Sequence, residues 1–326
     1  MTVNNLAAKL VGAALSAAVL AQAVPASASA AAATATATPF THVRVADHFD
    51  LAVGQQPENI ALEPHGAVDL TMSAARQVVR VNPDGTKRVL ATLPVPADGG
   101  VHTPVLGFPL LTGLVRAHDG TLYFLYATGT SDLTGLWRLT PGGSAERITP
   151  LPAGGLPNGL GLDPATGELY ATDSVLGTVW RMTTRGGAAT AWATGPDLAS
   201  TGFLGANGLK IHEGAVWVSN LDEGTVVRIP IRHDGSAGAP EIKATGLPGI
   251  DDFDFLGRSD RIVAAINTNN EVALIQPDGS HTIVLTGKDG LEGPTSIAVR
   301  DDTVYIASAS YILKQDPNLI TAHLRF

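Results

Sequence analysis

The sequence predicts an all-β fold, a six-bladed β-propeller of four-stranded blades, and three observations support this. One phrase recurs: a small polar residue, a strand of alternating apolar residues, a turn and a second strand. Repeats of roughly 40–50 residues built only from strands are typical of propellers, one per blade. The turns combine glycine with aspartate, asparagine or proline, as tight turns favour. The third strands also match, as in GLWRLTPGG, TVWRMTTRG and TVVRIPIRHDG. Clear copies start at Pro57, Leu156, Gly205, Gly249 and Gly293, and a weaker copy starts at Thr112.

The strands of one copy illustrate the pattern in order. In the third copy, Leu160 and Leu162 alternate along the first strand, and a DPATG turn leads to the second strand at 169–171. A DSVLG turn then leads to the third strand at 178–181. Alternation with period two is expected of strands that lie between two neighbouring blades.

The last copy lacks one strand. It runs through SIAVR and TVYIAS to NLITAHLRF at the C-terminus, which leaves the fourth strand missing. The segment 41–49 (THVRVADHF) can supply it from the other end of the chain. We therefore expect the N-terminal strand to close the ring and remove an exposed sheet edge.

The first forty residues differ from the repeats. Lys9 precedes an apolar run at 10–24, and small residues that follow it offer cleavage sites near Ala28 or Ala30. The run is short for a membrane span and has the flanks of a secretory signal. We expect a signal peptide at 1–30, a flexible Ala/Thr linker at 31–39 and the propeller at 40–326. An uncleaved anchor is the alternative to a secreted protein that is free of the membrane.

Composition excludes several functions. The 326 residues are 44% hydrophobic and 16% charged, which suits one large turn-rich domain. A net charge of −9 without a basic run argues against a nucleic-acid partner. With no cysteine, the chain has neither a thiol nucleophile nor a thiolate metal site. We expect a monomer that acts on a small molecule.

One position of the repeat carries a side-chain oxygen in every copy. The innermost strand of each blade lines the central channel, so equivalent residues at its start meet the axis at one height. Aligning the first strands by their apolar pairs puts six residues in this column, namely Glu58, Thr112, Asn158, Asn207, Asp251 and Thr295.

Two carboxylates and two amides that converge on one axis form a set of hard oxygen ligands. Such a set favours calcium, which accepts 6–8 oxygens in loose geometry. Magnesium and manganese are alternatives with stricter geometry. Zinc prefers histidine, and no histidine falls in the column. The simpler interpretation is that these residues only cap turns before strands.

The phrases PNGLGLD (157–163) and ANGLKI (206–211), together with this column, resemble the regucalcin/gluconolactonase family and the related paraoxonase-type lactonases over 57–310. The resemblance implies a channel calcium held by Glu58, Asn158, Asn207 and Asp251. It also implies hydrolysis of a lactone or related ester, with the calcium polarising the carbonyl and Asp251 or Asp252 activating water.

The sequence departs from both families in places. Thr112 stands where the paraoxonase type has a channel histidine, and Asn207 stands where the regucalcin type usually has aspartate. The first blade reads PEN rather than the common EGP. The resemblance therefore carries the metal site over better than the catalytic base.

Further residues are candidates for the pocket. His102, in the long connection at 95–111, is either a base or substrate contact or a solvated loop histidine. Asp173, Asn220 and Asn267 end second strands, so they either rim the pocket or cap turns. Phe108 and Phe203 can form an apolar wall, and Thr112 and Thr295 complete the column.

Three other functions stay open. The first is a non-enzymatic ligand-binding propeller with a structural calcium, since a fold alone does not define a function. The second is a metal-free relative resembling strictosidine-synthase-like proteins, against which the pair of Glu58 and Asp251 argues. The third resembles the streptogramin lyases, which have seven blades, whereas the repeats here number six.

Overall fold

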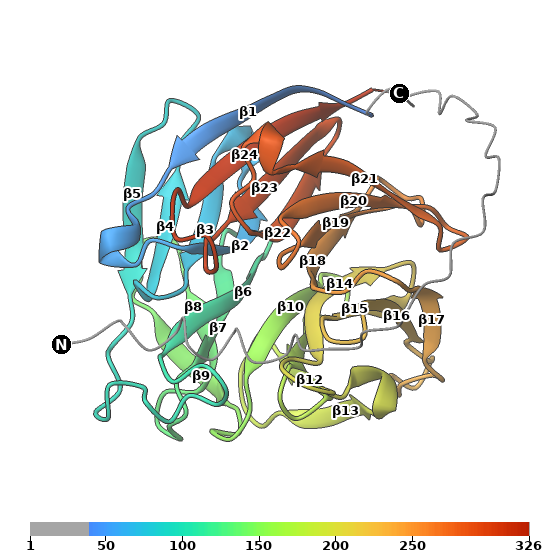
Figure 1. Ribbon diagram of the computed structural model, residues 1–326. Coiled ribbons are helices and arrows are strands. Elements are labelled where there is room, and N and C mark those ends of the chain that lie inside the picture. Colours follow the sequence, from blue (N-terminus) through green and yellow to red (C-terminus); the bar gives the residue numbers. More distant parts are fainter. Residues whose placement is uncertain (1–38, 326) are drawn as a thin grey trace, which may run out of the picture. The chain divides into compact units, whose positions relative to one another are not determined.

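The computed structural model describes residues 39–325, and this part of the chain forms six four-stranded antiparallel sheets arranged as a propeller (Figure 1). The predicted fold class is confirmed. The predicted signal peptide, and the linker except for Pro39, lie outside the described residues. Within 39–325, no helix has the length and apolar character needed to cross a membrane.

The first three blades follow the repeats, with strands ordered from the axis outward. Blade one consists of β2 (Pro57–Leu62), β3 (Val68–Met72), β4 (Gln77–Val81) and β5 (Lys87–Thr92). Blade two consists of β6 (Leu110–Arg116), β7 (Leu122–Ala127), β8 (Gly135–Leu139) and β9 (Glu146–Pro150). Blade three consists of β10 (Pro157–Asp163), β11 (Glu168–Asp173), β12 (Thr178–Thr183) and β13 (Thr190–Thr194).

The other three blades repeat the arrangement, and short 3-10 turns lie in the connections. Blade four consists of β14 (Ala206–His212), β15 (Ala215–Asn220), β16 (Thr225–Pro230) and β17 (Glu241–Ala244). Blade five consists of β18 (Ile250–Phe255), β19 (Ile262–Ile266), β20 (Glu271–Ile275) and β21 (His281–Thr286). Blade six begins with β22 (Pro294–Arg300), β23 (Thr303–Ser308) and β24 (Asn318–Leu324). The 3-10 turns are η1 (Leu51–Val53), η2 (Pro64–Gly66), η3 (Pro196–Leu198) and η4 (Gly287–Asp289).

Blade six is completed by the N-terminal strand, as predicted. β1 (Phe40–His48) pairs antiparallel with β24, and Phe40 lies opposite Leu324. Figure 1 shows β1, in blue, along the outer edge of the red C-terminal strands. The expected strand at 41–49 is displaced by one residue. Pairing the two ends of the chain leaves the last blade with four strands like the others.

The hydrophobic core lies between blades because each sheet presents apolar side chains on both faces. Between blades four and five, Trp217 packs with Phe253 and Phe255, and its ring meets the Phe255 ring edge-on with the centroids 5.1 Å apart. Between blades one and two, Phe124 and Trp137 belong to one buried cluster. Inter-blade packing of this kind holds the inner strands at fixed angles around the axis.

The inner strands form a closed ring in which each contacts the next, from β2 through β6, β10, β14, β18 and β22 back to β2. Each of them shows an irregularity of pairing at the column position, between residues such as Pro57 and Asn59 in β2 or Ile250 and Phe253 in β18. Bulges of this type re-aim side chains. The repeat therefore turns the same residue of each blade out of the regular pleat.

Glycine follows the column residue in blades two, three and four because the neighbouring inner strand is very close there. A Cβ on Gly113 would lie 2.4 Å from the Asn158 carbonyl oxygen, and one on Gly159 would lie 2.3 Å from that of Asn207. A Cβ on Gly208 would lie 2.6 Å from the Asp252 Cα. In the other three blades the same position carries a polar side chain, namely Asn59, Asp252 and Ser296.

Candidate metal centre at the propeller axis

The four predicted oxygen ligands occupy equivalent places at the axis. Each is the second residue of an inner strand, in β2, β10, β14 and β18. All four are buried, with exposed fractions of 7% for Glu58, 8% for Asn158, 2% for Asn207 and 7% for Asp251. Asp251 accepts a hydrogen bond from the Asn207 side chain and is close enough to Glu58 for the two charges to repel. The structure thus brings the two carboxylates and at least one amide together.

Burial dominates the electrostatics of the two carboxylates among these four residues. Burial raises the pKa of Glu58 to about 7, the charge of Asp252 adds to the increase, and a hydrogen bond from Tyr311 opposes it. Burial, with the charges of Glu58 and Asp252, raises the pKa of Asp251 well above its usual value, against the hydrogen bond from Asn207. Within 39–325, neither carboxylate has a basic partner.

Tyr311 is a member of the site that sequence reasoning missed. It lies in the connection 309–317 between β23 and β24, and its hydroxyl oxygen is 2.6 Å from Glu58 Oε2 and 2.6 Å from Ser73 Oγ. Burial, followed by the charge of Glu58, raises the pKa of Tyr311 well above its usual value. The only signal in the sequence was a tyrosine in a long connection outside the repeat.

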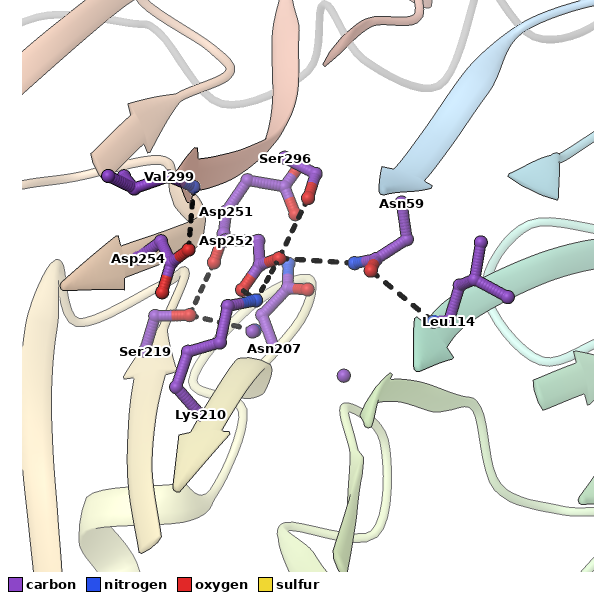
Figure 2. Close-up of polar contacts among 12 residues, drawn as sticks. Asn59, Leu114, Asn207, Lys210, Ser219, Asp251, Asp252, Asp254, Ser296 and Val299 are labelled. Carbon is purple, nitrogen blue, oxygen red and sulfur yellow. Dashed lines mark hydrogen bonds and ion pairs between the residues drawn. The ribbon is translucent and has the colours of Figure 1, made fainter. Parts of the chain in front are cut away.

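Asp252 belongs to a second polar layer and not to the ligand set. Lys210 Nζ donates to its Oδ1 at 2.8 Å and to its Oδ2 at 2.6 Å. Asn59 Nδ2 and Ser296 Oγ also donate to Oδ2, at 3.1 Å and 2.9 Å. Figure 2 shows these groups meeting around the Asp252 carboxylate beside Asn207 and Asp251. Residues from blades one, four, five and six therefore meet at the Asp252 carboxylate, which has Lys210 as its cationic partner.

The two column threonines use their hydroxyls to join blades. Thr112 Oγ1 donates to the Pro157 carbonyl oxygen at 2.9 Å, and Thr295 Oγ1 donates to that of Pro57 at 2.8 Å. Both threonines are buried. Each bond fixes the residue that precedes a predicted ligand, Asn158 or Glu58. The threonines therefore contribute to the site through the backbone of the next blade.

Hydroxyls on the second strands of blades three and four hold the bulges of the inner strands. Thr172 accepts from the Gly159 N–H at 2.7 Å and donates to the Asn207 carbonyl oxygen of the next blade. Ser219 accepts from Gly208 N–H at 2.8 Å and donates to the Asp251 carbonyl oxygen (Figure 2). The main chain of two predicted ligands is thereby fixed from the neighbouring blade.

The predicted rim residues bond to the loops that lead into the inner strands. Asp173 Oδ1 accepts from the Leu156 and Leu176 N–H groups, both at 2.9 Å. Asn220 Nδ2 donates to the carbonyl oxygens of Asp197 and Ala199, both at 3.0 Å. Asn267 Nδ2 donates to the Pro294 carbonyl oxygen at 3.2 Å. These contacts place all three beside the loops that lead into the inner strands, which they support.

Phe108 and Phe203 lie in one apolar cluster, half-buried together with Leu106 and Val175. The cluster also contains buried Leu204, which lies two residues before β14 begins. Apolar surface therefore lies among the connections of blades two to four, on the same face as the four predicted ligands. We call these four, Glu58, Asn158, Asn207 and Asp251, the ligand layer.

His102 lies in the connection between β5 and β6, where its side chain is 75% exposed. Its Nδ1 lies 2.7 Å from Asp98 Oδ2, so the two side chains form a solvent-exposed pair. No contact that joins His102 to the ligand layer is found within 39–325.

Comparisons with known proteins show the fold. No protein-family model matches the chain, and no curated protein matches it. Among solved structures it is similar to the calcium-binding protein regucalcin from Agrobacterium tumefaciens, with a TM-score of 0.64 and 16% identity over 87% of this chain and 95% of that one. A gluconolactonase from Xanthomonas campestris gives 0.61 and 17% over 88% and 96%. Virginiamycin B lyase from Staphylococcus aureus gives 0.61 and 15% over 88% and 100%. At these identities the likeness concerns architecture, and it confirms the predicted resemblance at that level.

Proposed function

We propose that this protein is a secreted, calcium-dependent hydrolase of a lactone or related ester, with the metal in the central channel. The contrast between two adjacent aspartates carries the proposal. Asp252 has Lys210 as an internal cation, whereas Asp251 and Glu58 are buried without a basic partner in 39–325. Buried charges are normally paired or bound to a metal. A bound cation would supply the missing partner.

The donor set fits calcium. Glu58, Asn158, Asn207 and Asp251 would hold the ion through oxygen atoms alone, with water completing the shell. Asn158 Nδ2 donates to Ser174 Oγ at 3.1 Å, which leaves the amide oxygen of Asn158 for a cation. When bound, the calcium would polarise a carbonyl and stabilise developing negative charge on its oxygen.

The residues around the ligands suggest which group accepts a proton and which side chains contact the substrate. Asp252 is committed to Lys210, Asn59 and Ser296, so of the two aspartates we assign proton acceptance to Asp251. The half-buried Phe108 and Phe203 favour a substrate that has an apolar substituent next to its ester group.

A second candidate is a ligand-binding propeller in which calcium only holds the channel together. The low exposure of the ligands, at most 8%, favours it. A substrate carbonyl would have little room to reach the metal unless Tyr311 or a neighbouring connection moves.

The test is calcium titration calorimetry on the domain from residue 39, followed by a panel of aldono-, aryl and acyl-homoserine lactones with chelator and with calcium restored. We expect calcium to bind and turnover to require it. Glu58→Gln and Asp251→Asn should weaken binding at least about tenfold, since each removes a charged ligand. Thr149→Val is the matched control, because this buried threonine lies in β9, the outermost strand of blade two, away from the axis.

Each outcome has one meaning. Absence of calcium binding would contradict the metal centre, and binding without turnover of any lactone would favour the ligand-binding propeller. Secretion has its own check: protein recovered from the medium should begin after Ala28 or Ala30, and an intact N-terminus would contradict cleavage.

A further inference from the structure

Blade six contributes to the ligand layer from outside the repeat. The hydroxyl of its column residue, Thr295, donates a hydrogen bond to the Pro57 carbonyl oxygen. The connection 309–317 of the same blade instead sends the Tyr311 hydroxyl to within 2.6 Å of Glu58 Oε2. The polar group that this blade brings to the layer is therefore a phenol attached to a ligand of blade one.

The backbone of the connection 309–317 fixes the direction of the Tyr311 side chain. Ser310 has a left-handed backbone with φ of 55°, which is uncommon for a residue other than glycine. Its carbonyl oxygen accepts from Lys314 N–H and its Oγ from Gln315 N–H, both at 2.9 Å. Its own N–H donates to the Glu292 carbonyl oxygen at 2.7 Å. These three hydrogen bonds of Ser310 fix the direction in which the chain enters Tyr311.

The Tyr311 hydroxyl has two acceptors at 2.6 Å, Glu58 Oε2 and Ser73 Oγ. The phenol has one proton, and the carboxylate is the stronger acceptor, so this proton goes to Glu58 while Ser73 Oγ stays in contact with the phenol oxygen. Blade three has the same device in shorter form. Ser174, which follows the second strand as Ser73 does, accepts from Asn158 Nδ2 at 3.1 Å and donates to the Ala206 carbonyl oxygen at 2.7 Å.

We propose that Tyr311 is a positioning residue for Glu58: its hydroxyl, backed by Ser73, holds Oε2 so that Oε1 is directed to the cation. The proposal rests on the calcium site proposed above. Partners that orient a metal ligand commonly contribute tenfold to a hundredfold in affinity. Tyr311 thus sets how tightly calcium is held without touching the ion.

The experiment compares Tyr311→Phe with Tyr126→Phe by calcium titration calorimetry. Tyr126 is the matched control, because it is a buried tyrosine whose hydroxyl donates at 2.7 Å to the Pro94 carbonyl oxygen, away from the ligands. We expect Tyr311→Phe to bind calcium about 10- to 100-fold more weakly and Tyr126→Phe to bind it as the unmodified protein does. In a Glu58→Gln background, Tyr311→Phe should have no further effect.

The outcomes separate this proposal from the one on which it rests. If the unmodified protein binds calcium and Tyr311→Phe binds it equally well, the positioning role is wrong and the metal centre stands. A loss that persists undiminished in the Glu58→Gln background would also overturn it, because the effect would then not act through Glu58. If the unmodified protein binds no calcium, both proposals fall. Should Tyr311→Phe not fold, Ser73→Ala replaces it, with a smaller loss of affinity expected and an unchanged affinity refuting the role.

Discussion

Replacing Lys210 by methionine would remove the internal cation of the channel. The ammonium group contacts both oxygens of Asp252, whose residue is 2% exposed, while the Lys210 side chain is 22% exposed. Methionine has a similar length and no charge, so the change would leave the Asp252 carboxylate with only its neutral donors, Asn59 and Ser296.

The expected loss of stability is large. Removing one partner of a buried ion pair typically costs about 3–5 kcal/mol, because the other charge stays buried without compensation. For a domain of this size, about 2 °C of melting temperature corresponds to 1 kcal/mol, so the midpoint should fall by roughly 6–10 °C. Asp252→Asn should cost less, since the partly exposed Lys210 can still reach water.

The measurement is urea unfolding of four proteins: the unmodified domain, Lys210→Met, Asp252→Asn and the double variant. The double variant should be more stable than Lys210→Met, because the unpaired charge is gone. A coupling free energy of about 1–3 kcal/mol would follow. If Lys210→Met unfolds within about 0.5 kcal/mol of the unmodified domain, the ion pair does not hold the channel together and the reasoning is refuted.

Three further predictions concern the pH dependence of stability, the pH dependence of calcium affinity and the closure of the ring. Because the pKa of Glu58 in the metal-free folded protein is about 7, above its usual 4.5, the folded state holds a proton between these values that the unfolded state has released. The stability of the metal-free protein that depends on Glu58 should therefore fall as pH rises from about 4.5 to 7. Calcium affinity should rise over the same range, because the ion must displace this proton; calorimetry from pH 5.5 to 8 tests this, and a pH-independent affinity would contradict it. Deleting the chain through residue 50 removes β1 and should lower the melting temperature of the whole domain; a melting curve like that of the intact domain would show that the ring does not need this strand.

Features that recur from blade to blade could be predicted from the sequence. The inner strands, the column at the axis and the closing strand all follow from comparing copies, because each copy occupies the same place around the axis. The bulge even coincides with the polar residue that the alignment of the apolar pairs places in the column.

Features that belong to one blade only could not be predicted in this way. Alignment puts Thr112 and Thr295 in the column, but it does not say that their hydroxyls turn to the neighbouring blade. Lys210 reads as an ordinary residue of the ANGLKI strand, although its ammonium group neutralises Asp252. Tyr311 has no counterpart in the other repeats. Their contacts depend on distances across the axis, which a linear pattern does not record.

Closure by β1 and β24 also decides when the molecule can finish folding. Thr41 and His323, which are hydrogen-bonded across this pair, are 282 positions apart in the chain. At about 5–20 residues per second, a ribosome takes on the order of tens of seconds to make the partner of a strand that it has already released. Until then β1 is an open edge that can pair with another chain. A cell that makes this protein must therefore shield the first strand until the last seven-residue strand arrives, and a message that stops before β24 yields a chain that cannot close.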